Sequence, residues 1–545
     1  TAQSNASWIT LSNFGGTGNG AVGYLATANR GARRTGTATI AGRTFTLTQE
    51  AFVCAVTIGP ATLPGGAMDE PYEQAVTAAG GSAPFVAGIT AGALPAGLSL
   101  TASPTGARLA GQPAEAGAFN FTIEVTDANG CAAARSYSLT IEPPAPIPTG
   151  LQFYPLPRPV RLLDTRAGMQ GCDAPGEKIP GNTARRQPAA GRTCSGLAIP
   201  ANAKALAGNI TTVESGGGFL TLYPGNAARP LAANSNYRPN EILNNAFTVG
   251  LGGDDGAFQI FVTSDTDLVV DVTGYYAPPT TGGLYFHPLP KPIRLLETRP
   301  GKTGCTATET PIEGGAAQAQ GARVTCNGVT IPAGAKAIVG NATSLNSGDG
   351  YLTLYPKGAT RPLAASSNFT AGQVMNAPFT VGLGTTGEFM IYSTTDLDLV
   401  VDVLGYYSDE ANDANGAGLL FHPLSTPVRL LETRAGFQGC YRTDAPLAAG
   451  ATREQQARGD CGGQTIAAAA LAIVGNATVV SPENGGWLTF WPNGAARPLV
   501  AATNFTTGQV FNRHFTVGLG ATGLFNIFTS ARTELVIDVS GFFAP

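Results

Sequence analysis

The sequence predicts an all-β protein made of tandem β-sandwich domains. Three observations lead to this: turn residues punctuate the whole chain, apolar and polar residues alternate between them, and one long segment occurs three times. The 545 residues include 72 glycines and 39 prolines, and no window sustains a helical period. Because domains usually have about 100–200 residues, a chain of this length contains several.

The repeated segment defines three units of about 130 residues each. "RLLDTR" stands at 161–166, and "RLLETR" follows at 294–299 and 429–434. Each unit contains "FTVGLG" and closes with a variant of "VVDVTGYY". A period this long is a complete domain with its own core, not one turn of a solenoid.

Within a unit, the apolar pattern is that of strands. In "GFLTLYP", Phe219, Thr221 and Tyr223 share one face, while Leu220 and Leu222 share the other. Such short alternating segments between turns indicate antiparallel sandwiches or jelly rolls. We therefore expect domains at 1–51, 52–142, 151–277, 284–407 and 419–545, joined by a stiff linker at 143–150, a similar one at 277–283 and a flexible one at 408–418.

Composition excludes several partners. The net charge is −4 with 12% charged residues, and the absence of a basic stripe argues against nucleic acid. No apolar stretch approaches the roughly 18–20 residues of a membrane helix, so the protein is not expected to span a membrane.

The eight cysteines fall into four couples, and the last three couples occupy matching places in the repeats. No CxxC motif is present, which argues against zinc or redox sites. One disulfide per couple predicts an oxidising compartment, outside the cytosol. The expected pairs are Cys54–Cys131, Cys172–Cys194, Cys305–Cys326 and Cys440–Cys461.

The first part of the chain resembles two known families. "SNASWI", "NRGARRTGT" and "AGRTFTLTQ" within 1–51 resemble the C-terminal half of the BACON domain of bacterial surface proteins and glycan-active enzymes. "GALPAGLSL", "GARLAGQPAEAGAFNFTIEVTDANGC" and "YSLTI" within 58–141 resemble the Ig-like domain common in bacterial adhesins. The triplicate resembles modules of secreted bacterial proteins that carry "RLLDTR" and "DVxGYY" motifs. These resemblances imply Ig-like and jelly-roll-like sandwiches and an extracellular or cell-surface location.

The half-length BACON resemblance also implies an incomplete sandwich. Its open strand edges would lie near Trp8, Ile9 and Phe14, where a neighbouring molecule could add strands. Such head-to-tail contacts propagate, so we expect self-association into a polymer.

We expect the repeated charged residues to have structural roles. Arg161, Arg294 and Arg429 are expected to hold the first strand of each unit, paired with the acid three residues later. Asp271, Asp402 and Asp538 are expected to be hydrogen-bond acceptors at strand ends. Two alternatives stay open. One is a functional pocket repeated three times. The other is calcium at Asp265, Asp267 and Asp271 and at the matching Asp396, Asp398 and Asp402, although Arg532 and Glu534 stand at two of these places in the third unit. No metal site is predicted.

Catalysis is not predicted. The only histidines are His287, His422 and His514, and the repeats do not share a histidine set. The glycines of "GTGNGAVG" lack a following βαβ unit, so they predict a turn rather than a nucleotide site. No cofactor is expected.

Aromatic pairs are the best functional lead. Rings four residues apart on a strand share one face, where they can stack on sugars or, alternatively, fill a core or an interface. The candidate glycan-contact residues are Phe219 and Tyr223, Tyr351 and Tyr355, and Trp487 and Trp491.

Together these features favour an extracellular, non-enzymatic structural protein of a bacterial surface, such as a filament or sheath subunit. The alternatives are a glycan-binding adhesin and an accessory region of a larger secreted enzyme.

Overall fold

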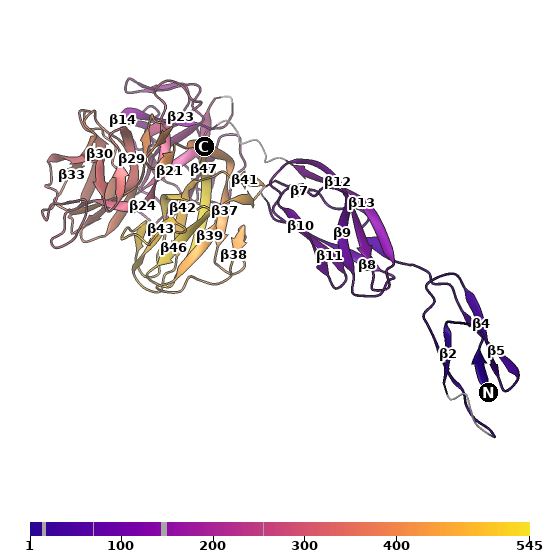
Figure 1. Cartoon of the computed structure of the whole chain (residues 1–545). Helices are drawn as coiled ribbons and strands as arrows, with labels where there is room; N and C mark the ends of the chain where they lie inside the picture. Colours follow the sequence, from indigo (N-terminus) through magenta and orange to yellow (C-terminus); the bar gives the residue numbers. More distant parts are fainter. Residues whose placement is uncertain (13–17, 69, 143–149, 254) are drawn as a thin grey trace. The chain divides into compact units, whose positions relative to one another are not determined.

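The computed structural model describes residues 1–12, 18–68, 70–142, 150–253 and 255–545. These residues contain strands and no helix (Figure 1), so the all-β prediction is confirmed. The chain divides into two compact units, Thr1–Pro146 and Ile147–Pro545.

The start of the first unit contains two small sheets. One has the order β1-β4-β5 and the other is the hairpin β2-β3. Ile9 is buried, and Arg34 lies over the Trp8 ring at 4.4 Å, whereas Phe14 lies outside the described residues. The strands are β1 (Ala2–Ser4), β2 (Ile9–Ser12), β3 (Gly23–Ala26), β4 (Arg34–Ile40) and β5 (Arg43–Gln49).

Residues 57–142 form a sandwich of two four-stranded sheets, β10-β11-β8-β6 and β7-β13-β12-β9. The alternation in "FNFTIEVT" directs Phe121, Ile123 and Val125 into the core between the sheets. The strands are β6 (Thr57–Gly59), β7 (Gly66–Ala67), β8 (Tyr72–Ala79), β9 (Val86–Gly92), β10 (Leu98–Ser103), β11 (Gly106–Gly111), β12 (Gly117–Thr126) and β13 (Ala132–Glu142).

The first repeat forms a sandwich of two sheets and a short hairpin. One sheet has the order β14 (Gln152–Asp164), β23 (Asp267–Ala277), β18 (Ala205–Val213), β21 (Leu243–Gly250). The other has the order β15 (Thr183–Pro188), β22 (Ala257–Val262), β19 (Gly218–Pro224), β20 (Ser235–Tyr237), and the hairpin is β16 (Arg192–Cys194) with β17 (Leu197–Ile199).

The second repeat has the same strand order. Its sheets are β25 (Thr306–Ala307), β24 (Tyr285–Glu297), β34 (Asp398–Ser408), β29 (Ala335–Leu345), β32 (Met375–Gly382), and β26 (Ala317–Gly321), β33 (Glu388–Ser393), β30 (Gly350–Pro356), β31 (Ser367–Phe369). Two hairpins complete it: β27 (Val324–Cys326) with β28 (Val329–Ile331), and β35 (Asn412–Asp413) with β36 (Gly416–Ala417). The segment expected to be a flexible linker therefore contains a hairpin, and Asn415 bonds it to the carbonyl of Thr330 and the hydroxyl of Tyr406.

The third repeat follows the same plan. Its sheets are β38 (Tyr441–Arg442), β37 (Leu420–Glu432), β47 (Glu534–Ala544), β42 (Ala472–Val480), β45 (Val510–Gly518), and β39 (Thr452–Gln456), β46 (Leu524–Thr529), β43 (Gly486–Pro492), β44 (Thr503–Phe505), with the hairpin β40 (Gly459–Cys461) and β41 (Gln464–Ile466). The three repeats are thus one fold in triplicate.

The four disulfides join the cysteines that the spacing had coupled. They are Cys54–Cys131, Cys172–Cys194, Cys305–Cys326 and Cys440–Cys461. In each repeat the bond ties the loop after the first strand to the end of a short hairpin strand. Closing a loop of this size contributes on the order of 3 kcal/mol.

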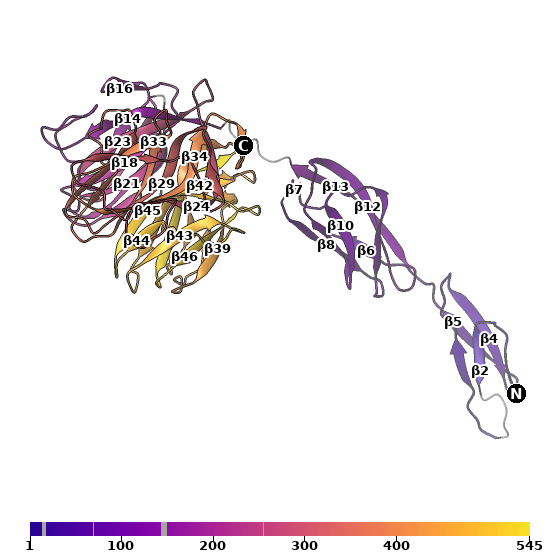
Figure 2. The same cartoon turned by 60° about the vertical axis from the view of Figure 1, so that its left-hand side comes forward.

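The repeats pack against one another in a cyclic order, which the sequence did not reveal. Backbone bridges connect Phe153 to Leu284, Phe286 to Leu419, and Phe421 back to Leu151. Strands β21, β32 and β45, one from each repeat, contact each other, and Figure 2 shows β21 and β45 side by side. The first repeat contacts the second, the second contacts the third, and the third contacts the first. The chain therefore has internal threefold pseudosymmetry.

An aromatic cluster forms the centre of this unit. It contains Phe153, Phe286 and Phe421 with Tyr276, Tyr407 and Phe543, all buried. The ring centroids Phe153–Tyr407, Phe286–Phe543 and Phe421–Tyr276 are each 4.4 Å apart. Each large side chain buried in this way stabilises the packed state by about 1.5–3 kcal/mol, so these rings hold the three sandwiches together.

Asparagines form a second set of contacts between repeats. In each repeat an asparagine Oδ1 atom accepts a hydrogen bond from a backbone N–H of the next repeat in the cyclic order. The pairs are Asn244 with Asn368, Asn376 with Asn504, and Asn512 with Asn236. Arg513, fully buried, donates to the carbonyls of Asn376 and Asn244, one from each of the other repeats. Burial lowers the pKa of Arg513 to about 9.

Candidate functional site

The arginine that opens each repeat lies at an interface between repeats. On β24, Arg294 Nε donates to Asp402 Oδ1 of β34 at 3.0 Å, because the two residues face each other in the strand register. Its Nη1 donates to Glu297 at 3.2 Å, and its Nη2 donates to the Leu499 carbonyl of the third repeat at 2.8 Å. The acid three residues after the arginine is therefore only part of its environment.

The other two repeats copy this arrangement in cyclic order. Arg161 bonds Asp164, Asp271 and the Leu363 carbonyl of the second repeat. Arg429 bonds Glu432, Asp538 and the Leu231 carbonyl of the first repeat. The arginine thus joins its own sandwich to the next one.

A second arginine of the motif completes the ion-pair network. Arg299 makes two bonds to Glu297, at 2.8 and 2.7 Å. Burial acts to raise the pKa of Glu297, but its bonds to Arg299 outweigh burial and hold the pKa below its usual range. Asp402 is more deeply buried, and burial raises its pKa to about 6 despite the opposing charge of Arg294.

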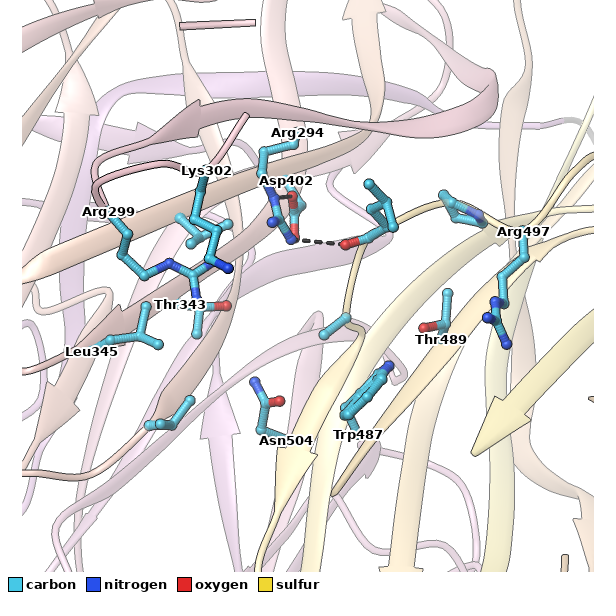
Figure 3. Close-up of a pocket in the computed structure, with 15 residues that line it drawn as sticks. Arg294, Arg299, Lys302, Thr343, Leu345, Asp402, Trp487, Thr489, Arg497 and Asn504 are labelled. Carbon is cyan, nitrogen blue, oxygen red and sulfur yellow. Dashed lines mark hydrogen bonds and ion pairs between the residues drawn. The ribbon is translucent and has the colours of Figure 1, made fainter. Parts of the chain in front are cut away.

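Between the second and third repeats, this network borders a groove of about 490 Å³. Figure 3 shows Arg299 and Lys302 on one side of it, with Trp487 and Arg497 opposite. The first two belong to the second repeat and the last two to the third. Four cationic side chains and one carboxylate line the groove: Arg294, Arg299, Lys302, Arg497 and Asp402.

An equivalent groove of about 240 Å³ lies between the first and second repeats. Arg161, Arg166 and Asp271 line one side, and Tyr351 and Leu363 line the other. Tyr351 occupies the place of Trp487, and Leu363 that of Leu499. The two predicted features, the arginine motif and the aromatic strand, therefore meet across repeat boundaries.

Only one ring of each predicted aromatic pair reaches solvent. Trp487 is 45% exposed and Phe219 is 37% exposed, whereas Trp491, Tyr223 and Tyr355 are buried. The glycan-contact expectation is therefore corrected for these three buried rings. The loop after β43 covers this face: Thr489 donates to the Val500 carbonyl and Trp491 donates to the Ala495 carbonyl, and a ring beneath that loop cannot stack on a sugar from solvent.

Each exposed ring belongs to a small cluster that recurs in every repeat. Trp487 lies 6.3 Å from Phe528, and the Arg497 guanidinium lies 3.9 Å from the centroid of Phe528. The corresponding cations are Arg361 over Tyr392 at 3.7 Å and Arg229 over Phe261 at 3.9 Å. Cation–π contacts of this kind fix the arginine beside the ring.

Leucines next to these arginines are unusually exposed. Leu231, Leu363 and Leu499 are 75%, 83% and 84% exposed. Sequence reasoning missed them together with Lys302, Arg497 and Asn504. The sequence contained a signal for these leucines, because "ARPL", "TRPL" and "ARPL" stand at matching places in the three repeats. A leucine that recurs in an otherwise polar loop indicates a contact or binding role.

The aspartates considered for calcium have separate partners. Asp265 accepts the Gly181 N–H, Asp267 accepts the Thr165 hydroxyl, and Asp271 pairs with Arg161. Across the described parts of the chain, no three His, Cys, Asp or Glu side chains are grouped to hold a metal ion.

The second repeat contains a serine, a histidine and an aspartate close together. Ser408 Oγ lies 3.3 Å from His287 Nε2, and Asp413 Oδ1 lies 3.5 Å from His287 Nδ1. His287 Nε2 also lies 3.0 Å from the Glu410 carbonyl, which can only accept, so Nε2 carries a proton and cannot take one from Ser408. All three side chains are buried, which excludes contact with a dissolved substrate.

The other histidines also lie in the protein interior. His422 stacks on Phe542 with ring centroids 4.9 Å apart. His514 contacts the Thr248 hydroxyl at 3.2 Å, and burial lowers the pKa of His514 to about 3. It is therefore neutral at physiological pH.

Comparison with known proteins identifies one part of the chain. Residues 55–142 match the family named "Putative Ig domain", which confirms the Ig-like resemblance there. No curated protein sequence matches the chain. No helix in the described residues could cross a membrane.

Solved structures align with low similarity. A Bacteroides ovatus mixed-linkage glucan utilisation locus protein, SGBP-B, in complex with a heptasaccharide, is 11% identical over 89% of this chain and 99% of its own, with a TM-score of 0.13. An endo-fucoidan hydrolase of glycoside hydrolase family 107 is 17% identical over 46% of this chain, with a TM-score of 0.15, and the chain spans 38% of its length. An archaeal virus turret protein with a triple jelly roll is 12% identical over 74% of this chain and 97% of its own, with a TM-score of 0.16.

Proposed function

We propose that this is an extracellular, non-enzymatic binding protein of a bacterial surface, an adhesin whose three-repeat unit holds glycans in the grooves between repeats. The observation that carries the proposal is that Trp487 of the third repeat meets Arg294 and Arg299 of the second repeat in one groove. An exposed ring offers a flat surface to the C–H face of a sugar, and the charged groups beside it can bond hydroxyl or acidic substituents.

The repetition of this site supports binding over a purely structural role. Tyr351 occupies the second groove, and Phe219 is the corresponding exposed ring at the third interface, where Arg429 bonds the Leu231 carbonyl. Partly exposed aromatic and leucine side chains cost solubility, and contiguous apolar patches commonly mark interaction sites. Repeated sites on one unit would bind a repetitive polymer through avidity.

The covalent chemistry supports the proposed location. Four disulfides persist in an oxidising compartment, and the Ig-like sandwich at 55–142 fits a surface protein. Glycoside hydrolysis uses a pair of carboxylates, whereas the acidic residue that lines the larger groove is Asp402, which is paired with Arg294; this supports binding without bond cleavage.

A glycan array with the full chain tests this proposal. We expect binding to polysaccharide fragments that falls about two- to tenfold in Trp487→Ala, because aromatic stacking contributes about 0.5–1.5 kcal/mol. Tyr24→Ala is the matched control, since Tyr24 is also about half exposed but lies in the first unit. Binding lost with Tyr24→Ala and retained in a triple variant of Trp487, Tyr351 and Phe219 to alanine would contradict the proposal.

A further inference from the structure

The interfaces between repeats share one architecture, but the residues that follow the arginine motif differ in charge. The third residue after each motif is Met169 in the first repeat, Lys302 in the second and Phe437 in the third. Lys302 lines the groove that also contains Trp487, whereas Met169 and Phe437 are about half exposed and apolar. The groove between the second and third repeats therefore has a cation that its counterparts lack.

The conserved part of each network is already neutralised. Arg294 and Arg299 share the carboxylates of Glu297 and Asp402, and the same pairing recurs in the other repeats. These arginines position the groove wall but add little net charge to it.

Lys302 and Arg497 are different. Neither has an ion-pair partner within 4.0 Å among the residues that the structure describes. Arg497 is held against Phe528 by its cation–π contact. Glu309, which follows β25, accepts the N–H of Gly301. The groove consequently presents, on opposite walls, two cations without ion-pair partners in the described part of the chain. The exposed ring of Trp487, on β43 of the third repeat, also lines it.

From this geometry we infer that the groove between the second and third repeats binds an acidic glycan, with Lys302 and Arg497 contacting its anionic substituents and Trp487 stacking on a sugar ring. The inference rests on the proposed function and specifies the ligand class of one of its three sites. The anionic group is either a carboxylate of a uronic acid or a sulfate ester; both accept charge-assisted bonds from ammonium and guanidinium groups. The cations that line the groove between the first and second repeats, Arg161 and Arg166, are both ion-paired, so that groove should prefer neutral sugars.

Isothermal titration calorimetry on the full chain tests whether the groove prefers acidic to neutral glycans. The probes are hexagalacturonate, a sulfated carrageenan hexasaccharide and a neutral galactan hexasaccharide. We expect one acidic hexasaccharide per chain, with affinity that falls as salt rises. Lys302→Met, which copies the first repeat, should weaken acidic binding about tenfold and reduce its dependence on salt.

The first repeat supplies the matched gain of function. Met169→Lys should create a second acidic site, so that two acidic hexasaccharides bind per chain. Affinity unaffected by Lys302→Met, equal affinity for neutral and acidic probes, or no binding of either acidic probe would overturn the inference. Neutral binding that depends on Trp487 would still uphold the proposed function, whereas acidic binding that depends on Lys302 but not on Trp487 would contradict both the ring contact and the proposed site.

Discussion

Replacing Arg294 by methionine tests how the repeated arginine stabilises the three-repeat unit. The guanidinium is 19% exposed and faces Asp402 and Glu297, which are buried. Removing one partner of a buried ion pair costs about 3–5 kcal/mol. We expect about 3 kcal/mol, the lower end, because Glu297 retains both bonds to Arg299 and Asp402 can take up a proton.

The pH dependence of this loss follows from Asp402. Its pKa is about 6 in the folded protein against 3.8 for the unpaired group, and loss of Arg294 raises the folded value further. When folding raises the pKa of a carboxyl, the folded protein gains stability at pH values below the unfolded-state pKa. This gain is lost as pH rises through the folded-state pKa. The variant should therefore be more destabilised at pH 8 than at pH 5.

Urea unfolding followed by tryptophan fluorescence measures this effect. The double variant with Arg294→Met and Asp402→Asn is the control, and its destabilisation should be the same at pH 5 and pH 8. From the sequence alone we expect the damage to stay within the second repeat, but the bond from Arg294 to the Leu499 carbonyl connects it to the third. A loss below about 1 kcal/mol that does not depend on pH would refute the reasoning.

Three further outcomes are expected. His514 stays neutral when folded, with a pKa of about 3 against 6.5 for an exposed histidine, so stability should fall by up to roughly 1.4 kcal/mol per pH unit as pH drops below 6.5; urea titrations should show that His514→Ala removes this slope. Phe286→Ala in the central cluster should cost about 3–5 kcal/mol and lower the calorimetric transition of all three repeats together; separate transitions would contradict their packing as one unit. Self-association stays a prediction: light scattering and electron microscopy should show oligomers that grow with concentration, and a stable monomer at high concentration would be evidence against it.

Much of the fold could be predicted because its signals are local. Alternation in "GFLTLYP" specifies which side chains share a strand face, and glycine and proline mark where strands end. The cysteine couples at matching places indicated one disulfide within each repeat, as observed. Such signals depend on residues close in sequence or repeated in register, so they survive without knowledge of the packing.

Contacts between repeats were decided only by the tertiary structure. A threefold sequence repeat is compatible both with separate sandwiches on linkers and with sandwiches packed in cyclic order, because alternation does not say which outer surface meets a neighbour. Arg294 pairs with Glu297, three residues later, and with the Leu499 carbonyl of the next repeat; only the first contact has a signature in the sequence. Trp487 and Trp491 look alike by spacing, yet the covering loop leaves one in solvent and buries the other. The groove exists because surfaces far apart in the chain meet, and their meeting depends on apolar area buried at the centre of the unit rather than on any local pattern.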